Sequence, residues 1–491
     1  MTRSIGKFDI AVLVLAGIGF FSVFRTAPSV APYVYDESDY MSAASRGLVA
    51  NFLDKPSLSL IGFLRVGLGT GIDRAKRTNL SEYIRSTKDI TFLRHFHGPI
   101  YFYWLATLAP LVHADEYWMR FSGLILQFAT FVIIYIGALS LVGRTAALIS
   151  SFLFLFSPSE LGAFTQLSAH VPYVLFAVLT LILFASGRFY LAVAAFAFAF
   201  CSIEYAILLP IACICGARTR ACGVPTHGDT AFRSVGLFLL TVLILWPMGI
   251  LKLSALKSYF YISYLALLRK GSFGTQSPPA IWFQRLQASP LEYSLAILSV
   301  LLVILYLRKL PGKRLLVPCL VYATLMFLTT LKNTSLNPTY ISSILPALAL
   351  VTGTIMAQIL DKFPKALRMA LLAALLIVIV SEGYRRLPPP YAPNPGRSRL
   401  LASIRQAGIA QSSALVPYDL LPTLSYYFPS MDIHAYLPSD NLTAILEKFR
   451  SGGYRNLVYS GSEQNGVFTM LDGRFFRAET DPLVAQMTLS Q

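Results

Sequence analysis

Charged residues are scarce in this chain of 491 residues, at 13% of the total, whereas 55% of the residues are hydrophobic. Soluble globular domains carry about 25% charged residues, so this chain has too little polar surface to coat a water-soluble body of its size. A composition this hydrophobic also excludes an intrinsically disordered protein. The scarcity of charge therefore predicts a polytopic membrane protein.

Cysteine is scarce too, and basic residues outnumber acidic ones. The 41 Lys and Arg against 24 Asp and Glu give a net charge of +17. Two interpretations stay open, basic cytoplasmic loops and attraction of an anionic substrate. The excess is spread over many loops rather than one stripe, which excludes nucleic acid as a partner. The five cysteines have no metal-ligand spacing and predict neither a zinc site nor a disulfide framework; they are Cys201, Cys213, Cys215, Cys222 and Cys319.

Nearly uncharged runs recur through the first four-fifths of the chain and predict about eleven membrane-spanning helices. A crossing needs ~20 apolar residues, so the shorter runs must borrow polar flanking residues. The first run is not followed by an A-x-A-like cleavage site, which favours a retained anchor over a signal peptide. The runs are 10–24, 121–142, 145–159, 171–187, 189–203, 205–217, 234–251, 293–307, 315–331, 338–360 and 369–381.

Two further segments decide the topology. The run 100–112 is too short to cross and predicts an interfacial or re-entrant helix. The segment 189–217 is either one tilted helix interrupted by Glu204 or a hairpin with Glu204 at its outer tip; Arg188 and Arg218 at its ends favour the hairpin. With a cytoplasmic N-terminus, three basic clusters then lie inside, as the positive-inside rule requires: Arg218, Arg220 and Arg233; Arg308, Lys309, Lys313 and Arg314; and Lys362, Lys365 and Arg368.

This topology places three segments on the outer face: the loop 25–98, the loop 252–290, and everything after Gly383. The tail begins with a proline-rich linker over 383–396, a stiff spacer. Beyond it, short apolar runs alternate with a helix-like stretch and predict a small α/β domain over 397–491. The predicted fold class is an all-α polytopic membrane module over 1–382 with this small extracytoplasmic domain.

An acidic cluster, Tyr35-Asp36-Glu37-Ser38-Asp39-Tyr40, follows the first span. Three carboxylates within four residues repel one another unless a cation, a donor or water separates them. At a membrane surface such a cluster is costly, which favours a functional role. The alternative is a solvated loop or a helix N-terminus, where acidic residues are favourable.

A histidine motif, Arg94-His95-Phe96-His97-Gly98-Pro99, precedes the aromatic stretch Ile100-Tyr101-Phe102-Tyr103-Trp104. Two histidines at i and i+2 are a weak metal signal. Gly-Pro breaks the backbone before the short helix, and Tyr and Trp suit the headgroup level. The alternative is an aromatic interface anchor with incidental histidines.

Basic residues on the predicted outer face form a third group. Cations that converge there would bind a lipid phosphate; the alternative is general contact with anionic headgroups. The middle outer loop carries Lys252, Lys257, Arg269, Lys270 and Arg285, and Lys332 lies at an outer helix end.

Taken in order, these motifs resemble the GT-C glycosyltransferases of the protein O-mannosyltransferase and aminoarabinose-transferase type. That family typically shows D-E-x-x-Y, then H-P-P-L-Y-Y-W-L, then R-L-P-S, and a late Y-x-x-x-x-x-P. The matching residues are Asp36-Glu37-x-x-Tyr40, His97-Gly98-Pro99-Ile100-Tyr101-Phe102-Tyr103-Trp104-Leu105, Arg120-Phe121-Ser122, and Tyr340 to Pro346. The resemblance covers about residues 1–382. Two positions depart from the family: Gly98 stands where Pro is usual, and His170 stands where an Asp is frequent.

The resemblance implies a polyprenyl-phosphate sugar donor, an outer-face active site and inversion at the sugar carbon. A prenyl phosphate is a stable leaving anion, so the reaction needs no strong general acid, whereas the acceptor hydroxyl needs a base, for which Asp36 is the candidate. Glu37 would orient the sugar or Asp36. The candidate phosphate ligands are Arg94, His97, Arg285, Lys332, Arg269 and Lys270. Tyr40, His170 and Glu204 are candidate substrate-binding residues, with a solvated turn as the alternative for Glu204.

No cofactor is required by this chemistry, and a divalent cation stays open. The expected partners are the polyprenyl-phosphate sugar donor, membrane lipids and an unspecified lipid, glycan or protein acceptor. The composition, rich in Ala, Leu and Arg with few Lys, favours a bacterial inner membrane. A transporter or flippase would show repeats and charges at mid-membrane; no repeat is found and the ionisable residues gather at span ends. A scaffold, the third alternative, would tolerate loss of the Asp36 cluster.

Overall fold

The structure, a computed structural model, divides into two compact units that are described separately below. Unit 1 comprises Met1–Pro28, His97–Trp104 and Trp118–Tyr391, and unit 2 comprises Ser29–Phe96, Leu105–Tyr117 and Ala392–Gln491. Unit 2 thus combines the tail with most of the segment 25–98 and with the short segment 105–117. The residues that the structure describes are 5–53, 94, 97–217, 228–251, 256, 259–260, 278–306, 312–331, 337–386, 395–406, 408–436, 440, 442–460, 465–471 and 474–477.

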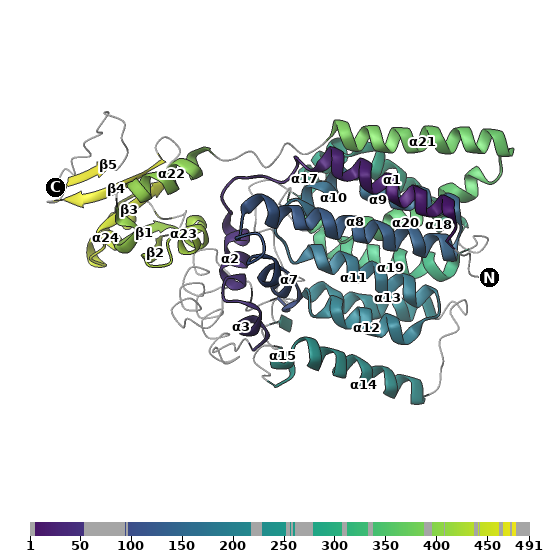
Figure 1. The fold of residues 1–491 in the computed structure, drawn as a ribbon, viewed down its shortest axis with the longest axis horizontal. Helices are drawn as coiled ribbons and strands as arrows, with labels where there is room; N and C mark the ends of the chain where they lie inside the picture. The colour runs from purple at the N-terminus through teal and green to yellow at the C-terminus, as the bar shows by residue number, and fades with distance from the viewer. Residues whose placement is uncertain are drawn as a thin grey trace. The chain divides into compact units, whose positions relative to one another are not determined.

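Unit 1 is a bundle in which helices are the regular elements of the described residues. Most of its long helices run side by side with similar directions (Figure 1). The helices are α1 (Lys7–Phe24), α7 (Ile100–Leu108, which continues into unit 2), α8 (Glu116–Leu141, which begins there), α9 (Arg144–Leu155), α10 (Pro158–Phe164), α11 (His170–Ala185), α12 (Phe189–Phe200), α13 (Leu208–Ala217), α14 (Gly228–Leu245), α15 (Pro247–Leu251), α17 (Pro278–Ala288), α18 (Pro290–Tyr306), α19 (Lys313–Thr330), α20 (Leu345–Leu360) and α21 (Lys365–Arg385), with 3-10 turns η2 (Glu204–Ile207) and η3 (Pro338–Tyr340).

These apolar helices are those of an integral membrane protein. Four of them, α1, α8, α19 and α21, are long and apolar enough to cross a bilayer, and the number rises to six if two bent pairs each count as one span. The pairs are α9 with α10, bent by 55°, and α17 with α18, bent by 110°. Each of the eleven apolar runs contains a helix, but the count of eleven crossings stays a prediction.

Prolines mark the first residue of several helices. Pro158 and Pro290 stand at the first position of α10 and α18, where a missing N–H costs nothing. The run 338–360 was expected to be one helix, and this is wrong at its start. The residues of η3 form a 3-10 turn there, and the α-helix begins only at Leu345.

The segment 189–217 is a hairpin, and the long tilted helix is excluded. The helix α12 ends at Phe200, and η2 leads into α13. Phe189 at the start of α12 and Ala217 at the end of α13 pack against the same cluster, so the first and last residues of the segment lie close together. The nine residues of α7 span about 14 Å, too little to cross the hydrocarbon core.

One end of the bundle is fastened by a buried acid. Asp9 accepts hydrogen bonds from Arg144, at 2.8 and 2.9 Å, and from the Tyr135 hydroxyl at 2.8 Å. These contacts join the start of α1 to α8 and α9. Farther along, α9 and α20 pack so closely that a Cβ on Gly353 would lie 2.0 Å from the Ser150 hydroxyl, so a larger residue there would separate the helices.

Unit 2 contains a five-stranded sheet in the order β2-β1-β3-β4-β5. The pairs β2-β1 and β1-β3 are parallel, and the pairs β3-β4 and β4-β5 are antiparallel. The apolar runs 414–416 and 457–459 lie in β1 and β3, and residues 432–436 of the third run form β2. Residues 442–450 of the helix-like stretch lie in α24. The elements are α2 (Tyr35–Ala44), α3 (Leu48–Phe52), α22 (Pro395–Gln406), η4 (Ile409–Gln411), β1 (Ser413–Pro417), η5 (Tyr418–Leu420), α23 (Leu421–Tyr427), β2 (Asp432–Tyr436), α24 (Leu442–Ser451), β3 (Asn456–Ser460), β4 (Asn465–Leu471) and β5 (Arg474–Arg477).

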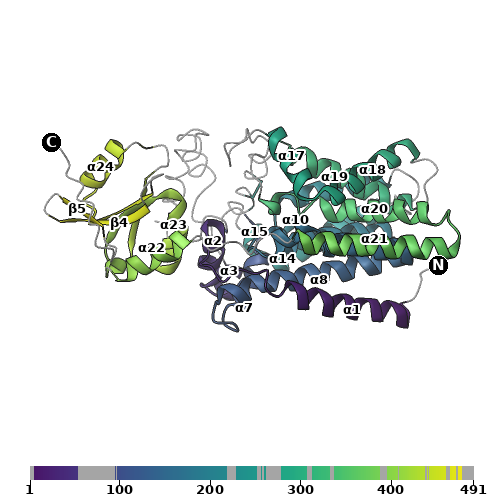
Figure 2. The ribbon, with the colours of Figure 1, turned by 90° about the horizontal axis from the view of Figure 1, so that it is seen from above.

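Helices cover both faces of this sheet (Figure 2). On one face, Val416 of β1 packs with Ile404 of α22 and Leu424 of α23. On the other, Leu415 of the same strand packs with Phe449 of α24. Because successive strand residues point to opposite faces, β1 supplies the centre of both apolar layers.

Candidate functional site

The acidic cluster lies in unit 2 on the first turns of α2. The carboxylate of Glu37 accepts a hydrogen bond from the backbone N–H of Val34 at 3.3 Å, which completes a capping box at the helix start. Asp36 is exposed, whereas Glu37 and Asp39 are buried. The acidic cluster therefore forms a helix N-terminus, which is one of the alternatives that the sequence left open. Of its three acidic residues, the helix exposes only Asp36 at the surface.

Arg94 and Tyr40 are buried in the same unit. The guanidinium of Arg94 donates a hydrogen bond of 2.9 Å to the carbonyl of Asn51. The amide of Asn51 in turn donates to the carbonyls of Ala43 and Gly47, at 2.8 and 2.9 Å. Arg94 thus helps to close the connection between α2 and α3, a structural role that the sequence did not indicate.

His97 and Glu204 form a close pair in unit 1. The Nδ1 atom of His97 lies 2.9 Å from Oε2 of Glu204, and the two side chains are 13% and 5% exposed. Glu204 occupies the turn between α12 and α13, as predicted. Its burial and its pairing exclude the alternative that it is a solvated turn residue. Because buried polar groups must be partnered, each of the two residues fixes the other.

Gly98 allows this approach. A Cβ at residue 98 would lie 2.1 Å from the carbonyl oxygen of Cys201, so a larger side chain could not fit. The N–H of Ile100 donates to the same carbonyl at 3.1 Å. The departure from the family pattern at residue 98 therefore matches the local packing of α7 against the end of α12. The Tyr259 hydroxyl contacts the neighbouring carbonyls of Phe200 and Ile203, each at 2.7 Å.

His170 begins α11 at the same end of the bundle. Its Nδ1 lies 3.2 Å from the Ser343 hydroxyl. Its ring centroid lies 5.5 Å from that of Tyr205, the residue after Glu204, and 6.1 Å from that of Tyr340. The bundle thus brings His97, Glu204 and His170 into one polar cluster, built from four segments that are far apart in the sequence.

Arg285 is buried near the end of α17, with its guanidinium 4.8 Å from the ring centre of Trp282. This cation–π contact supports the buried guanidinium. Arg269, Lys270 and Lys332 lie outside the described residues. Within the described part of the chain, no group of three or more His, Cys, Asp or Glu could hold a metal ion.

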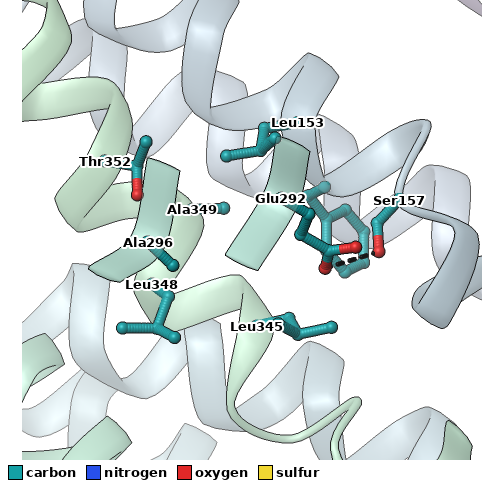
Figure 3. A pocket seen from close by; sticks show the side chains of 9 residues that line it. Leu153, Ser157, Glu292, Ala296, Leu345, Leu348, Ala349 and Thr352 are labelled. Carbon is teal, nitrogen blue, oxygen red and sulfur yellow. Dashed lines mark hydrogen bonds between the residues drawn. The ribbon is translucent and has the colours of Figure 1, made fainter. Parts of the chain in front are cut away.

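A second acidic pair, which was not predicted from the sequence, lies inside unit 1. Glu160 and Glu292 are buried at the starts of α10 and α18. Glu292 accepts a hydrogen bond of 2.8 Å from the Ser157 hydroxyl (Figure 3), and Ser157 also caps α10 by accepting from the N–H of Glu160 at 3.1 Å. Among the residues that the structure describes, neither carboxylate oxygen of Glu160 has a hydrogen-bond partner.

A cavity of about 10 Å³ adjoins Glu292, room for one water molecule. Its lining is mostly apolar: Leu153, Phe154, Ser157, Glu292, Ala296, Leu345, Leu348, Ala349 and Thr352. A signal for this pair does exist in the sequence. Residues 157–160 and 289–292 both read Ser-Pro-x-Glu, a helix-start signature with an acid at the third helical position.

No protein-family model matches the sequence, and no curated protein matches it either. Solved structures do match. ArnT from Cupriavidus metallidurans bound to undecaprenyl phosphate has a TM-score of 0.55 at 14% identity, over 91% of this chain and 88% of that one. The archaeal oligosaccharyltransferase AglB from Archaeoglobus fulgidus, in complex with an inhibitory peptide and a dolichol-phosphate, has a TM-score of 0.59 at 11% identity, over 92% and 69%.

Both similar proteins are GT-C fold glycosyltransferases. At these identities the likeness shows the fold, and it confirms the GT-C fold expected from the order of the motifs.

Proposed function

We propose that this chain is a membrane glycosyltransferase that moves a sugar from a polyprenyl-phosphate donor to a hydroxyl acceptor. The observation that carries the proposal is the GT-C fold, combined with an exposed Asp36 in the D-E-x-x-Y position at the start of α2. One similar structure holds undecaprenyl phosphate and the other a dolichol-phosphate, and both ligands are polyprenyl phosphates, the lipid carrier of the donor class proposed here.

In the proposed reaction, the acceptor hydroxyl oxygen attacks the anomeric carbon of the sugar, and the bond from that carbon to the phosphate oxygen breaks. The prenyl phosphate leaves as an anion, and the configuration at the carbon inverts. Asp36 takes the hydroxyl proton as general base. Its exposure on α2 supports this role, because a base must be accessible to the substrate. Glu37, which caps the helix, would hold the turn that carries Asp36.

Positive groups would stabilise the negative charge that builds on the leaving phosphate. We propose His97 and Arg285 for this role, together with Arg94, Arg269, Lys270 and Lys332. The contact of His97 with Glu204 supports a fixed imidazole orientation, since a carboxylate that pairs with one ring nitrogen sets the tautomer and the direction of the ring. His170 and Tyr40 are proposed to contact the sugar or the acceptor.

We further propose that the reaction occurs at the outer face of a bacterial inner membrane, with the N-terminus in the cytoplasm. The donor sugar is already activated by its phosphate, so the proposal requires no organic cofactor. A divalent cation is tested directly: if one is needed, excess chelator stops transfer and added Mg²⁺ or Mn²⁺ restores it.

The experiment that tests the function uses the purified protein in lipid nanodiscs. The protein is incubated with a panel of polyprenyl-phosphate sugars and hydroxyl acceptors, and free prenyl phosphate is measured by mass spectrometry. We expect one donor to lose its sugar at a rate that depends on the amount of protein. A parallel assay in liposomes follows donor movement between leaflets. Movement of the donor lipid between leaflets without any loss of sugar would show that the protein is a transporter and not a glycosyltransferase.

A further inference from the structure

The backbone of Tyr33, three residues before Asp36, is held on both sides by α23 within unit 2. The N–H of Tyr33 donates a hydrogen bond of 2.8 Å to the Tyr427 hydroxyl. The hydroxyl of Thr423, one helical turn away on α23, donates to the carbonyl of Tyr33 at 3.4 Å. A third contact lies on α2 itself, where the Ser38 hydroxyl donates to that of Thr423 at 3.3 Å. Two side chains of α23 therefore fix the chain on both sides of the first turn of α2.

Tyr427 also reaches a third segment. Its hydroxyl accepts from Tyr33 and donates to the carboxylate of Glu116, at 2.7 Å. Burial and this hydrogen bond hold the pKa of Tyr427 far above its usual range, and burial raises the pKa of the neighbouring Tyr426 to about 12. The Tyr427 hydroxyl thus stays protonated at any physiological pH and keeps both hydrogen bonds.

The side chain of Tyr33 completes the junction. Its hydroxyl donates to the carbonyl of Ala114 at 2.8 Å, and its ring is fully buried against the rings of Tyr426 and Tyr427, with centroids 5.4 and 6.3 Å away. Ala114 and His113 both have φ of +53°, a strained conformation for residues other than glycine that persists only where the surroundings enforce it. Such over-determined strain is typical of functional junctions.

The helix α23 can act as a firm support because it belongs to the core of the sheet domain. Leu421 and Leu424 are buried in the apolar cluster beneath β1. The polar residues Thr423 and Tyr427 reach the segment that carries the acids. The contacts therefore connect the sheet directly to the start of α2.

We infer that the C-terminal sheet domain positions the acid-bearing helix α2, with Tyr427 and Thr423 as positioning residues that act through Tyr33 and Ser38. The inference rests on the proposed function, since it gives the tail a role in orienting Asp36. Loss of the Tyr427 hydroxyl frees the turn before Asp36, so turnover falls while the groups that bind the donor are unchanged.

The first arm of the test measures docking without any activity. Cysteines are placed at Ser38 and Thr423, whose side-chain oxygens lie 3.3 Å apart, within reach of a disulfide after a small shift. A protease site is inserted in the linker 387–394, and the tail fragment is followed on non-reducing gels after cleavage. We expect it to stay attached until reductant is added. Matched controls are Ser38→Cys alone and Ser38→Cys with Ser451→Cys, which lies on α24 across the sheet; neither should retain the fragment.

The second arm measures kinetics. Tyr427→Phe removes one oxygen and should lower kcat by about 10- to 100-fold, as small misplacements of a catalytic group do. Its KM for the donor should stay within about twofold of the wild-type value, and its melting temperature should be unchanged. Tyr426→Phe is the matched control, since that hydroxyl makes no hydrogen bond in the described structure, and it should behave as wild type. Thr423→Val should act as Tyr427→Phe does, and Thr423→Ser, which keeps the hydroxyl, should recover turnover.

The outcomes separate the two proposals. Release of the tail fragment from the double-cysteine protein would overturn the docking. Turnover of Tyr427→Phe at the wild-type rate in an active enzyme would overturn the positioning role. A fall in kcat that comes with a lower melting temperature, so that loss of folded protein accounts for the lost turnover, would also overturn the positioning role. The tyrosine would then act on stability alone. A wild-type protein that transfers no sugar from any donor would overturn the proposed function and this inference with it.

Discussion

Replacing Glu204 by Gln should weaken the structure around His97, and the size of the effect can be worked from the geometry. Nδ1 of His97 and Oε2 of Glu204 are 2.9 Å apart and almost fully removed from solvent. Hydrogen bonds to charged groups contribute about 1.5–3 kcal/mol, and a buried partner that is left unsatisfied adds a desolvation penalty. Either single change, Glu204→Gln or His97→Ala, should therefore lower stability by about that amount.

The assay is a double-mutant cycle followed by thermal unfolding in detergent. At about 2 °C per kcal/mol, the lower end of the range for domains of 150–250 residues, each single variant should melt about 3–6 °C below wild type. Because each change removes the same interaction, the double variant should melt no more than about 1–2 °C below the weaker single variant. Glu447→Gln is the matched control, since Glu447 is exposed on α24, and it should leave the melting temperature unchanged.

The result that would refute this reasoning is additivity. If the two single shifts simply sum in the double variant, His97 and Glu204 do not depend on each other, and the proposed orientation of the imidazole by the carboxylate is wrong.

Three further predictions follow from the described packing and from the proposed donor site. Gly98→Ala should destabilise the protein by about 1–3 kcal/mol, as overpacking does, because the new Cβ would meet the carbonyl of Cys201. The control Gly19→Ala, where the Cβ has open space around it, should be neutral or stabilising. Equal melting temperatures for the two variants would contradict the close approach at Gly98. Glu160→Leu should raise stability by about 1–3 kcal/mol, because it removes a buried carboxyl that has no hydrogen-bond partner within the described part of the chain. A lower melting temperature would show that the carboxyl is stabilised by a ligand or ion. Lys332→Ala should weaken donor binding more than it slows turnover at saturating donor, and an unchanged donor affinity would exclude its phosphate role.

The sequence predicted those features that short local patterns encode. The placement of Glu204 at a turn followed from Arg188 and Arg218 on either side of an apolar segment. The acid at the start of α2 followed from a run of four residues. The Ser-Pro-x-Glu pattern that ends in Glu160 and Glu292 was equally local, and a search for helix starts at the edges of the apolar runs would have found it.

Contacts between residues far apart in the sequence could not be predicted from such local patterns. Glu204 is 107 residues from His97, and the pair depends on the approach of α7 to the end of α12, which only Gly98 permits. Tyr427 and Glu116 are 311 residues apart, and neither stands in a recognisable motif. The solvated-turn alternative for Glu204 was wrong for the same reason, since its burial comes from helices that the local sequence does not specify.

The central claim is that Asp36 is the base in a sugar transfer, and the most direct measurement is the transfer rate of Asp36→Asn at saturating donor. The account predicts a loss of about 100-fold or more, the usual contribution of a general base, with donor affinity and melting temperature unchanged and with Asp432→Asn, an exposed acid of the sheet domain, fully active. Transfer at a near-normal rate by Asp36→Asn would contradict the account.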